Sequence, residues 1–517
     1  MMELRVLYAG ARSATLLLAD GGLYETAKTY DLFLNGAPIA NPGTAVFSLF
    51  DLTPDVPYTL TARSGGEEAV VSFHTEAEAY TLDVRAFGAV GDGAHDDTAA
   101  IQAAILCCPD KGRVLIKKGD YLVSPLFLKS HVRIELQKGA ALRLTPDRAR
   151  CPILPGMVAR RDEKDDLNLG SWEGNPLDMY AALITGVGVS DAVIYGEGTL
   201  DGQGALGGWW REPKAKRGAW RGRMLFLNRC ENVVVQGLSF KDSPAWNLHP
   251  YFSQNLKFLN VSVSAPKDSP NTDGFDPESC QNVLLAGARF SLGDDCVAIK
   301  SGKLYMGKTY HTPCQNIEIA HCLMENGHGG VTIGSETAGG VYHVRVHHCL
   351  MRNTDRCLRV KTRRGRGENA VIDDIRFSHI RAENVKAPFV INAFYFCDPD
   401  GHSEYVQTRD AQPKDGRTPS LKAFLFEHIA CSGAVCAGVF LGLPEAPIER
   451  IELHDIRVRY TDAKAPFAAV MADGFAPLLK RGLIAQNVKE LILNGVDIDA
   501  EPRLETDNVT KIKEENV

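Results

Sequence analysis

The sequence predicts an all-β protein in which a small β-sandwich precedes a right-handed parallel β-helix. Short alternating strands separated by turn residues occupy the first part of the chain, a pattern typical of a sandwich. From about residue 79 onward, short β-rich runs recur at intervals of one solenoid coil, with Gly and Asn between them and no long helix. We therefore expect two domains, 1–78 and 79–517.

Composition and charge exclude several classes of function. The chain has 517 residues, of which 44% are apolar and 23% charged, as in an ordinary soluble protein with a sizeable core. A net charge of -7 argues against an extended nucleic-acid-binding face. No apolar stretch approaches 18 residues, so no membrane span is expected.

The cysteines and the N-terminus suggest a cytoplasmic protein. There are 13 Cys, an odd number, with no Cys-x-x-Cys spacing, and only Cys107 and Cys108 are adjacent. The first residues show no secretory signal pattern. We expect reduced, buried thiols and no metal or cofactor, with a non-Sec export route left open.

The N-terminal domain is predicted from four alternating runs and a loop. The runs are Ala14–Leu18, Tyr30–Leu34, Tyr58–Ala62 and Ala69–Phe73. The segment Phe50–Tyr58 resembles the loop and buried Tyr of a fibronectin type III domain, so the sandwich is expected to be fibronectin type III-like. Residues 75–79 are a plausible linker.

A helical lid is expected at the start of the β-helix. Asp83–Gly93 reads as a strand entering a Gly-rich turn, and Asp96–Thr98 can cap a helix. Ile101, Ile105 and Leu106 follow at helical spacing. A lid would cover the open first coil, which otherwise exposes its core and unpaired backbone groups.

The coil repeat is marked by asparagines. Asn232, Asn255, Asn282 and Asn316 each begin a β-rich run, at intervals of 23, 27 and 34 residues. Further runs, among them 344–346, 372–375 and 448–451, continue the series. The core is expected to be a stack of inward Val, Ile, Leu, Phe and Cys.

Three acids are the first candidates for catalysis. Asp273 precedes Asp294 and Asp295 by 21 and 22 residues, about one coil, so the three can lie side by side. Asp276 is a weaker candidate. Clustered like charges raise at least one carboxyl pKa. Glycoside hydrolysis needs carboxyl groups in two protonation states, one acid to protonate the leaving oxygen and one base to activate water.

Basic and aromatic residues follow in later coils. His328 stands between two glycines, where a ligand can approach it closely. Arg359 and Lys361 are two residues apart, hence on one face of a strand, and form a cradle for a carboxylate. Tyr395 lies 34 residues after Lys361, where it could contact a sugar or pack in the core.

Two loops before the catalytic coils carry tryptophans. One spans about 160–175 with Trp172, and the other spans 207–221 with Trp209 and Trp210. Aromatic loops beside a groove can close one end of it into a pocket. Trp172 and His249 are candidate substrate contacts. Trp246 and His249 either line the groove or pack against it.

The motifs together resemble those of a known family. The series Asn271–Asp273, Gly293–Asp295, Gly327–Gly329 and Arg359–Lys361 is similar to the polygalacturonase family of glycoside hydrolases, family 28. The resemblance covers roughly residues 80 to 500. It implies hydrolysis of α-1,4-galacturonosidic bonds with inversion. Val360, where Ile is more usual, is a conservative departure.

The resemblance also implies a role for each site residue. Asp294 would be the general acid, while Asp273 and Asp295 would position and deprotonate water. His328 would support protonation of the acid. Arg359 and Lys361 would hold the galacturonate carboxylate. Tyr395 falls where the family has a Tyr that contacts substrate.

The motifs are compatible with more than one function. We expect an exo-acting galacturonidase that takes oligogalacturonides or polygalacturonate and has no nucleic-acid or membrane partner. An endo-polygalacturonase or a rhamnogalacturonan hydrolase is the main alternative. A lyase is less favoured, because elimination needs a basic proton abstractor and usually calcium. A non-catalytic, pectin-binding β-helix is a remote alternative, and the sequence does not determine the oligomeric state.

Overall fold

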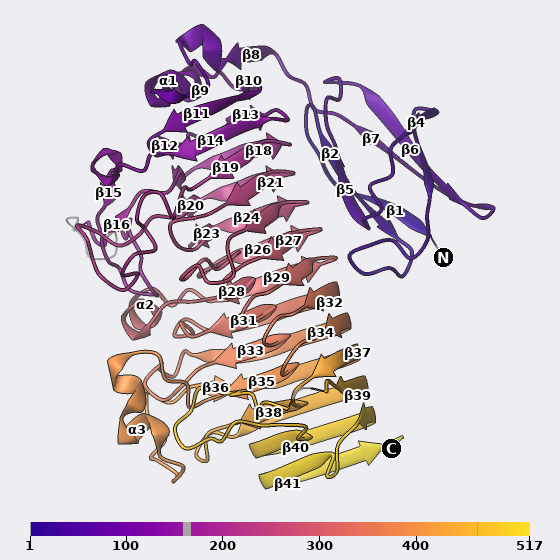
Figure 1. Ribbon diagram of the computed structural model, residues 1–517, viewed down its shortest axis with the longest axis vertical. Helices are drawn as coiled ribbons and strands as arrows, with labels where there is room; N and C mark the ends of the chain where they lie inside the picture. Colours follow the sequence, from indigo (N-terminus) through magenta and orange to yellow (C-terminus); the bar gives the residue numbers. More distant parts are fainter. Residues whose placement is uncertain (1, 159–166, 463, 517) are drawn as a thin grey trace.

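The computed structural model describes residues 2–158, 167–462 and 464–516 and bears out the predicted all-β class. A parallel β-helix forms the long body, and an antiparallel sandwich packs beside its N-terminal half (Figure 1). The last sandwich strand ends at His74, and the first β-helix strand begins at Tyr80. Residues 160–166 of the predicted first loop lie outside the described residues.

The sandwich has one sheet of three strands and one of four. Its strands are β1 (Glu3–Ala9), β2 (Ala14–Ala19) and β5 (Val46–Leu49) in one sheet, and β4 (Ala37–Ile39), β3 (Asp31–Leu34), β6 (Pro57–Ser64) and β7 (Glu67–His74) in the other. The Tyr58 hydroxyl accepts a hydrogen bond from the Thr53 backbone N–H at 2.9 Å, and its ring stacks on Phe73. These contacts tie the Phe50–Tyr58 loop to the strand that follows it.

The β-helix is built from three parallel stacks of strands. The first comprises β8 (Tyr80–Asp83), β10 (Gly112–Ile116), β13 (Arg133–Leu136), β18 (Ser190–Gly196), β21 (Glu231–Gln236), β24 (Gln254–Leu259), β26 (Gln281–Ala286), β29 (Cys314–Ala320), β32 (Val341–Arg352), β34 (Val371–Glu383), β37 (Ala423–Ala434), β39 (Ile448–Tyr460), β40 (Leu483–Ile498) and β41 (Leu504–Glu515). The second comprises β9 (Asp92–Asp96), β11 (Gly119–Val123), β14 (Ala140–Leu144), β19 (Thr199–Asp201), β22 (Ser239–Lys241), β25 (Ser262–Ser264), β27 (Arg289–Ser291) and β30 (Leu323–Glu325).

The strands of the third stack are shorter. It comprises β12 (Leu126–Phe127), β17 (Ile184–Val187), β20 (Leu225–Asn228), β23 (Leu248–Tyr251), β28 (Val297–Ile299), β31 (Val331–Gly334), β33 (Leu358–Lys361), β35 (Phe389–Asn392) and β38 (Gly438–Leu441). The other short strands are β15 (Ile153–Leu154), β16 (Met179–Tyr180) and β36 (Ser420–Leu421). From β32 onward, single long strands serve both the first and second stacks.

The core is a column of apolar side chains at matching positions. Ile194, Val235, Phe258, Leu285 and Ile319 are in direct register along the first stack, and all are buried. Each inward side chain packs on its equivalent in the coils before and after. The hydrophobic effect therefore holds successive coils in one register.

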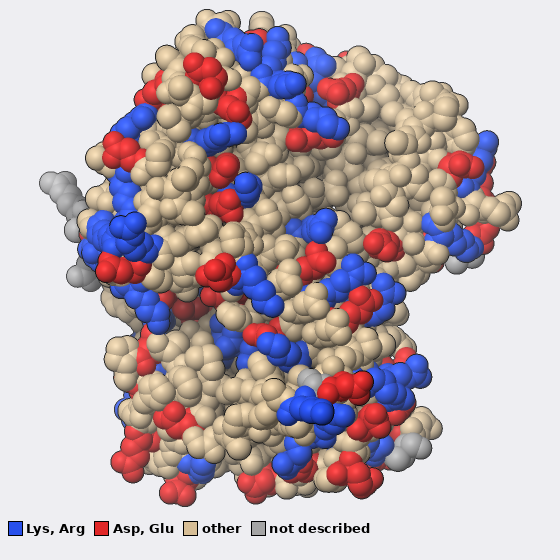
Figure 2. All heavy atoms as spheres, in the orientation of Figure 1, with Lys and Arg blue, Asp and Glu red and all other residues tan. Residues whose placement is uncertain are grey.

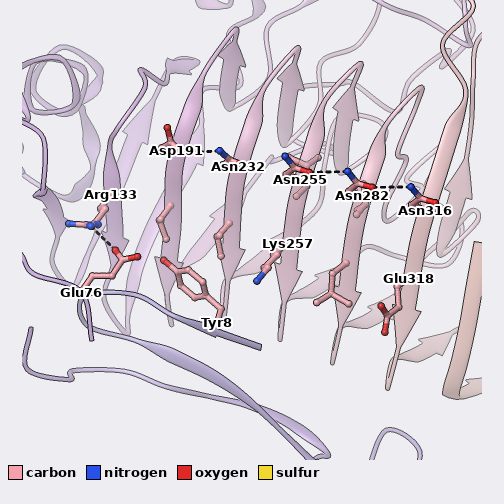
Figure 3. Close-up of a pocket in the computed structure, with 15 residues that line it drawn as sticks. Tyr8, Glu76, Arg133, Asp191, Asn232, Asn255, Lys257, Asn282, Asn316 and Glu318 are labelled. Carbon is pink, nitrogen blue, oxygen red and sulfur yellow. Dashed lines mark hydrogen bonds and ion pairs between the residues drawn. The ribbon is translucent and has the colours of Figure 1, made fainter. Parts of the chain in front are cut away.

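An asparagine ladder explains the repeat seen in the sequence. Asn232, Asn255, Asn282 and Asn316 all have left-handed backbone angles, with φ between 54° and 56°, at the turn that enters the first stack. Asn tolerates this conformation better than most residues. The Asn282 and Asn316 amides each donate to the preceding Asn at 3.0 Å, and Asn232 donates to Asp191 (Figure 3).

Helices are short and lie outside the coils. They are α1 (Thr98–Cys107), α2 (Leu304–Tyr310), α3 (Glu404–Gln407) and the 3₁₀ turns η1 (Val84–Phe87), η2 (Arg148–Arg150) and η4 (Pro399–His402). Helix α1 covers the first coil, as expected, and buries Ile101 and Ile105. Leu106, predicted on the apolar face, is exposed. Asp97 supports the preceding turn, because its carboxylate accepts from the Val90 and Gly91 N–H groups.

The sandwich contacts the β-helix through an apolar cluster and a few polar bonds. Val46 packs against Val234, Leu259 and Ala286 of the first stack. The buried Gln236 amide donates to Thr15 at 2.7 Å. A cavity of about 670 Å³ remains beside this contact, with the asparagine ladder along one wall (Figure 3). The two domains therefore share a partly buried interface.

The surface bears mixed charge. Acidic and basic side chains are interspersed over the face shown in Figure 2. All 13 cysteines are free, and all but Cys107 and Cys397 are buried. Among the residues that the structure describes, no helix is both long enough and apolar enough to cross a membrane.

Candidate active site

The predicted site residues meet on the outer face of the third stack. Asp294 and Asp295 immediately precede β28, His328 precedes β31, and Arg359 and Lys361 lie within β33. Strand β28 pairs with β31, and β31 pairs with β33, so these residues lie in three successive coils. Along β33, alternation turns Val360 into the core and leaves its two basic neighbours facing outward.

A cavity of about 980 Å³ covers this face. The predicted residues that line it are Trp172, Asp273, Asp294, His328, Arg359, Lys361 and Tyr395. Asp295 lies directly behind this lining, bonded to Lys361. The structure thus brings eight of the nine predicted residues to one place, and the exception is His249.

The three acids form a tight cluster. Asp273, Asp294 and Asp295 each offer a carboxylate oxygen, and these oxygens lie within 4.8 Å of one another. Asp273 and Asp295 are buried, whereas Asp294 is half-buried and faces the cavity. Asp294 Oδ1 accepts from the Asp295 backbone N–H at 2.9 Å, which orients its carboxylate.

The surroundings shift the pKa values of Asp273 and Asp295 in opposite directions. Burial, and then the Asp294 charge, raise the pKa of Asp273 well above its usual value. Burial also acts to raise the pKa of Asp295, but the Lys361 and Arg359 charges overcome it and hold that pKa far below its usual value. Asp295 is therefore ionised, while Asp273 can retain a proton.

Arg359 and Lys361 both form ion pairs with Asp295. Lys361 Nζ lies 2.8 Å from Asp295 Oδ2, and Arg359 Nη1 lies 3.4 Å from Asp295 Oδ1. Both cations sit over the Tyr395 ring, at 5.6 and 5.8 Å from its centre. Both cations, Asp295 and Tyr395 are buried, yet the two cations still line the cavity. The pair can therefore hold Asp295 ionised and still receive a carboxylate from the cavity.

His328 is oriented by an acid that the sequence did not single out. His328 Nδ1 pairs with Asp355 Oδ2 at 2.9 Å, and Lys386 Nζ lies 2.7 Å from the other Asp355 oxygen. The hydrogen bond to Asp355 raises the pKa of His328, against the effect of burial. His328 keeps 53% of its side chain exposed, so the imidazolium faces solvent and any ligand.

The glycines beside His328 are required by packing. A Cβ at Gly327 would lie 2.6 Å from the Asp294 carbonyl oxygen. A Cβ at Gly329 would lie 2.3 Å from Thr332 Oγ1 and 2.9 Å from Asp295 Oδ1. All three distances are shorter than contacts that real Cβ atoms make. The Gly-His-Gly motif therefore lets the His328 backbone lie directly against the acids.

Sequence reasoning missed a buried lysine at the centre of the acids. Lys300 Nζ lies 3.3 Å from Glu336 Oε2, 3.5 Å from Asp276 Oδ1 and 4.0 Å from Asp273 Oδ2. It also lies 4.4 Å from the centre of the Trp246 ring. The available signal was its position just after Val297–Ile299, at the end of the strand that the acids precede.

A stack of tryptophans forms the wall toward the N-terminal coils. The Trp172 ring stacks on Trp220 at 4.8 Å and on Trp246 at 6.4 Å, with near-parallel planes. The Arg223 guanidinium lies over both Trp172 and Trp246. Arg221 donates to Asn271 Oδ1 at 2.6 Å, which anchors the start of the first acidic motif.

One predicted substrate contact, His249, and one residue of a predicted wall loop, Trp209, need correction. His249 is fully buried beneath Trp246, where Nε2 lies 3.0 Å from Glu278, and it does not line the cavity. Trp209 is only 1% exposed, because it packs edge-on against Tyr180. Neither can touch a substrate. Both are covered by neighbouring coils and loops whose placement the sequence pattern does not show.

The tryptophan loop is tied to a loop on the far side of the acids. The Lys303 backbone N–H donates to the Gly174 carbonyl at 2.9 Å. Lys303 Nζ pairs with Asp398 at 2.8 Å, and Asp398 also pairs with Arg363 at 3.3 Å. A continuous rim therefore runs from residues 172–174 through Lys303 to the loop that carries Asp398 and Pro399.

Comparison with known proteins gives consistent similarities. A family model described as glycosyl hydrolases family 28 matches residues 161–415, and one described as rhamnogalacturonase A/epimerase, pectate lyase-like, matches residues 81–141. An endo-polygalacturonase of Pectobacterium carotovorum subsp. carotovorum is 32% identical over 58% of this chain and 72% of its own length. A probable polygalacturonase of Vitis vinifera is 27% identical over 79% of this chain and 81% of its own.

Solved structures show the same fold. A family 28 exopolygalacturonase from Yersinia enterocolitica covers 100% of this chain and 98% of its own, with a TM-score of 0.67 and 17% identity. An exopolygalacturonase from Thermotoga maritima covers 84% of this chain and 92% of its own, with a TM-score of 0.63 and 24% identity. The likeness to the first structure therefore includes the N-terminal sandwich as well as the β-helix.

Proposed function

The chain belongs to family 28 of the glycosyl hydrolases, and we propose that it is an exo-acting polygalacturonase that releases galacturonate from chain ends. It is a glycoside hydrolase with polygalacturonase activity, and its substrate is a pectic oligogalacturonide or polygalacturonate. Similar proteins include both endo- and exo-acting enzymes. The shape of the cavity supports the exo mode here.

The observation that carries the exo proposal is the closed rim beside the acids. An endo enzyme needs a groove open at both ends, so that a polymer can pass through. Here the stack of Trp172, Trp220 and Trp246 bounds the cavity toward the N-terminal coils, and Lys303 joins this loop to Asp398. Rigid aromatic walls supply a large contact area for a terminal sugar ring. A chain end fits such a pocket better than the middle of a polymer does.

In the proposed mechanism, the acids divide the work of a single displacement. Asp294 faces the cavity and gives its proton to the leaving glycosidic oxygen. Asp295, which Lys361 and Arg359 keep ionised, accepts a proton from the attacking water, and Asp273 helps to hold that water. The charged His328 can return a proton to the Asp294 side of the cluster by donating its own, and it regains a proton from solvent, to which 53% of its side chain is exposed.

Recognition of the uronate rests on the buried cations. Lys361 and Arg359 face the cavity beside Tyr395, and their charges are only partly matched by Asp295. A substrate carboxylate would add the second negative charge that this pair can accommodate. Neutral sugars lack that charge, so the site favours galacturonate over galactose.

Product analysis tests the exo proposal directly. With polygalacturonate or trigalacturonate as substrate, monogalacturonate should be the main product from the first minutes, while the viscosity of the polymer falls slowly. The pocket admits only a chain end, so internal bonds remain uncut. A rapid fall in viscosity with a ladder of mid-length oligomers would refute the exo mode and leave the hydrolase assignment intact.

A variant of the rim links that outcome to the structure. Lys303→Ala removes the pair with Asp398, so longer products should become a larger share of the total. Lys308→Ala, on the exposed face of the same helix α2, is the matched control and should keep the wild-type product pattern. Identical products from both variants would show that the rim does not set the mode of action.

The pH profile tests the role of His328. Because the bond to Asp355 raises the pKa of His328, the charged form persists to higher pH and is lost as the pH rises through that raised value. Asp355→Asn should therefore move the alkaline limb of kcat/KM to lower pH. Asp455→Asn is the matched control, because His428 pairs with Asp455 at the same 2.9 Å away from the cavity. An unmoved limb in Asp355→Asn would remove His328 from the mechanism.

Two further features are proposed with this function. The sandwich is proposed to be fibronectin type III-like, supported by its sheets of three and four strands and by the Tyr58 bond to the loop before it. A cytoplasmic location is proposed because all 13 cysteines are free thiols. There the enzyme would act on imported oligomers, which suits a pocket for chain ends.

A further inference from the structure

Three histidines meet at a bend of the β-helix, away from the cavity that holds the acids. His321 lies at the bend between β29 and β30, and His347 and His348 occupy the matching place one coil later. Each offers one ring nitrogen, and these nitrogens all lie within 4.8 Å of one another. Among the described residues, the other such group of three is the catalytic acids.

The spacing of the rings suits a metal ion. His347 Nδ1 and His348 Nδ1 are 3.0 Å apart. Two imidazoles on one tetrahedral zinc ion, with Zn–N bonds of about 2.0–2.1 Å, place their nitrogens about 3.4 Å apart. The His347 side chain is 28% exposed.

Two of the three rings already have the partners that metal-bound histidines use. His321 Nδ1 bonds to the Leu23 carbonyl oxygen at 2.7 Å, which leaves its Nε2 as the acceptor nitrogen. His347 Nε2 lies 3.3 Å from the Glu318 carboxylate, which leaves its Nδ1 as the acceptor. Carbonyl and carboxylate partners of this kind fix the tautomer and orientation of a ligand imidazole.

The three rings line one cavity. A cavity of about 340 Å³ between the sandwich and the β-helix reaches all three rings, so an ion has a path to them.

We propose that His321, His347 and His348 bind one divalent transition-metal ion of the zinc class at the junction of the two domains. Three imidazoles suit zinc, nickel and copper better than calcium or magnesium, which prefer oxygen ligands. The ion would lie outside the catalytic cavity and would not take part in hydrolysis. Because His321 is held by Leu23 of the sandwich, the ion would also stabilise the contact between sandwich and β-helix.

The competing explanation is a hydrogen-bonded histidine ladder without an ion. At equivalent turns of later coils, the His348 ring stacks on His379 at 4.6 Å, and the His379 ring lies 4.8 Å from His428 in a tilted contact. In that case the 3.0 Å contact between His347 Nδ1 and His348 Nδ1 is a hydrogen bond. The ladder alone gives no reason for zinc to bind, so the two explanations predict different results.

Zinc binding by the full-length protein distinguishes them. Protein purified without a polyhistidine tag and stripped with chelator should bind one zinc ion per chain, measured by titration calorimetry and by elemental analysis after dialysis. Its Tm should rise by roughly 2–5 °C with zinc well above its Kd. The ladder explanation predicts no stoichiometric binding and no shift in Tm.

Matched substitutions assign the ion to these residues. His321→Asn and His348→Asn should each abolish the stoichiometric binding and the Tm shift, because Asn tolerates the left-handed backbone at both positions. His428→Asn, at an equivalent left-handed position of the ladder, is the control and should bind zinc as the wild type does. Zinc bound equally by all three variants would place the ion elsewhere and overturn the proposal.

A second variant covers the case in which a histidine variant fails to fold. Glu318→Gln keeps all three rings but weakens the partner of His347. It should bind zinc about 10- to 100-fold more weakly than the wild type. Unchanged affinity in a folded Glu318→Gln protein would contradict the proposed geometry. Activity toward galacturonides should be the same with and without zinc.

Discussion

Asp294→Asn is expected to lose about 100-fold or more in kcat while it still binds substrate. The variant cannot give a proton to the leaving oxygen, and general acid catalysis contributes about 10²–10⁴ to a rate. The fold should persist, because an Asn carbonyl oxygen can accept the same bond from the Asp295 N–H. Rates with trigalacturonate and binding of the same substrate by calorimetry are the measurements.

The control for that variant is an exposed acid in the preceding turn. Asp268→Asn removes the same charge outside the cavity and should leave kcat unchanged. Turnover by Asp294→Asn near the wild-type rate would remove Asp294 from the role of acid. Asp273, whose pKa is raised by burial and by Asp294, would then be the next candidate for it.

Lys361→Ala is expected to lower kcat/KM by about 30- to 700-fold, which corresponds to roughly 2–4 kcal/mol of transition-state binding. The substitution leaves Asp295 buried without its nearest cation, at 2.8 Å, and removes half of the proposed carboxylate cradle. Breaking a buried ion pair from one side is strongly destabilising. A lower Tm should therefore accompany the loss of activity.

A surface lysine gives the comparison for Lys361. Lys422 Nζ lies 2.7 Å from Glu449, but both side chains are substantially exposed. Pairs of this kind contribute about 0–1 kcal/mol, so Lys422→Ala should change Tm and kcat/KM little. If Lys361→Ala behaved like Lys422→Ala, the buried pair would not be the support for Asp295 that its geometry indicates.

The same variant should change the pH dependence. The pKa of Asp295 is depressed in the folded protein, so its ionised form contributes stability above the unfolded pKa, and that contribution is lost as the pH falls through the folded value. Without Lys361 the folded pKa rises. The acid limb of kcat/KM should therefore move to higher pH, and resistance to acid unfolding should decrease. An acid limb that stays in place would argue against an ionised Asp295 as the base.

The coil period made much of the site predictable. In a parallel β-helix, residues separated by one coil are stacked in register, so sequence spacing translates directly into neighbourhood. Asp273, Asp294 and His328 could be placed together on this ground, and the alternation along β33 placed Arg359 and Lys361 on one face. The asparagines marked the coils because their turn requires a left-handed backbone.

Residues outside the motifs were harder to place. The signal for Lys300, its position at the end of a strand, is weak, because a lysine there usually faces solvent. His249 and Trp209 looked like site residues because aromatic and imidazole groups often line grooves, yet both are covered by neighbouring segments. Whether such a side chain faces a groove or a neighbour depends on loop conformation, which has no period.

The fold class, the coil register and the order of the site motifs can be read from the sequence alone, because hydrophobic periodicity and turn chemistry are local properties. Which acid is buried, which cation pairs with it and which loops close the cavity became clear from the three-dimensional structure. It also brought His321 beside His347 and His348 under the sandwich. These outcomes depend on contacts between distant segments, whose energies no single stretch of sequence contains.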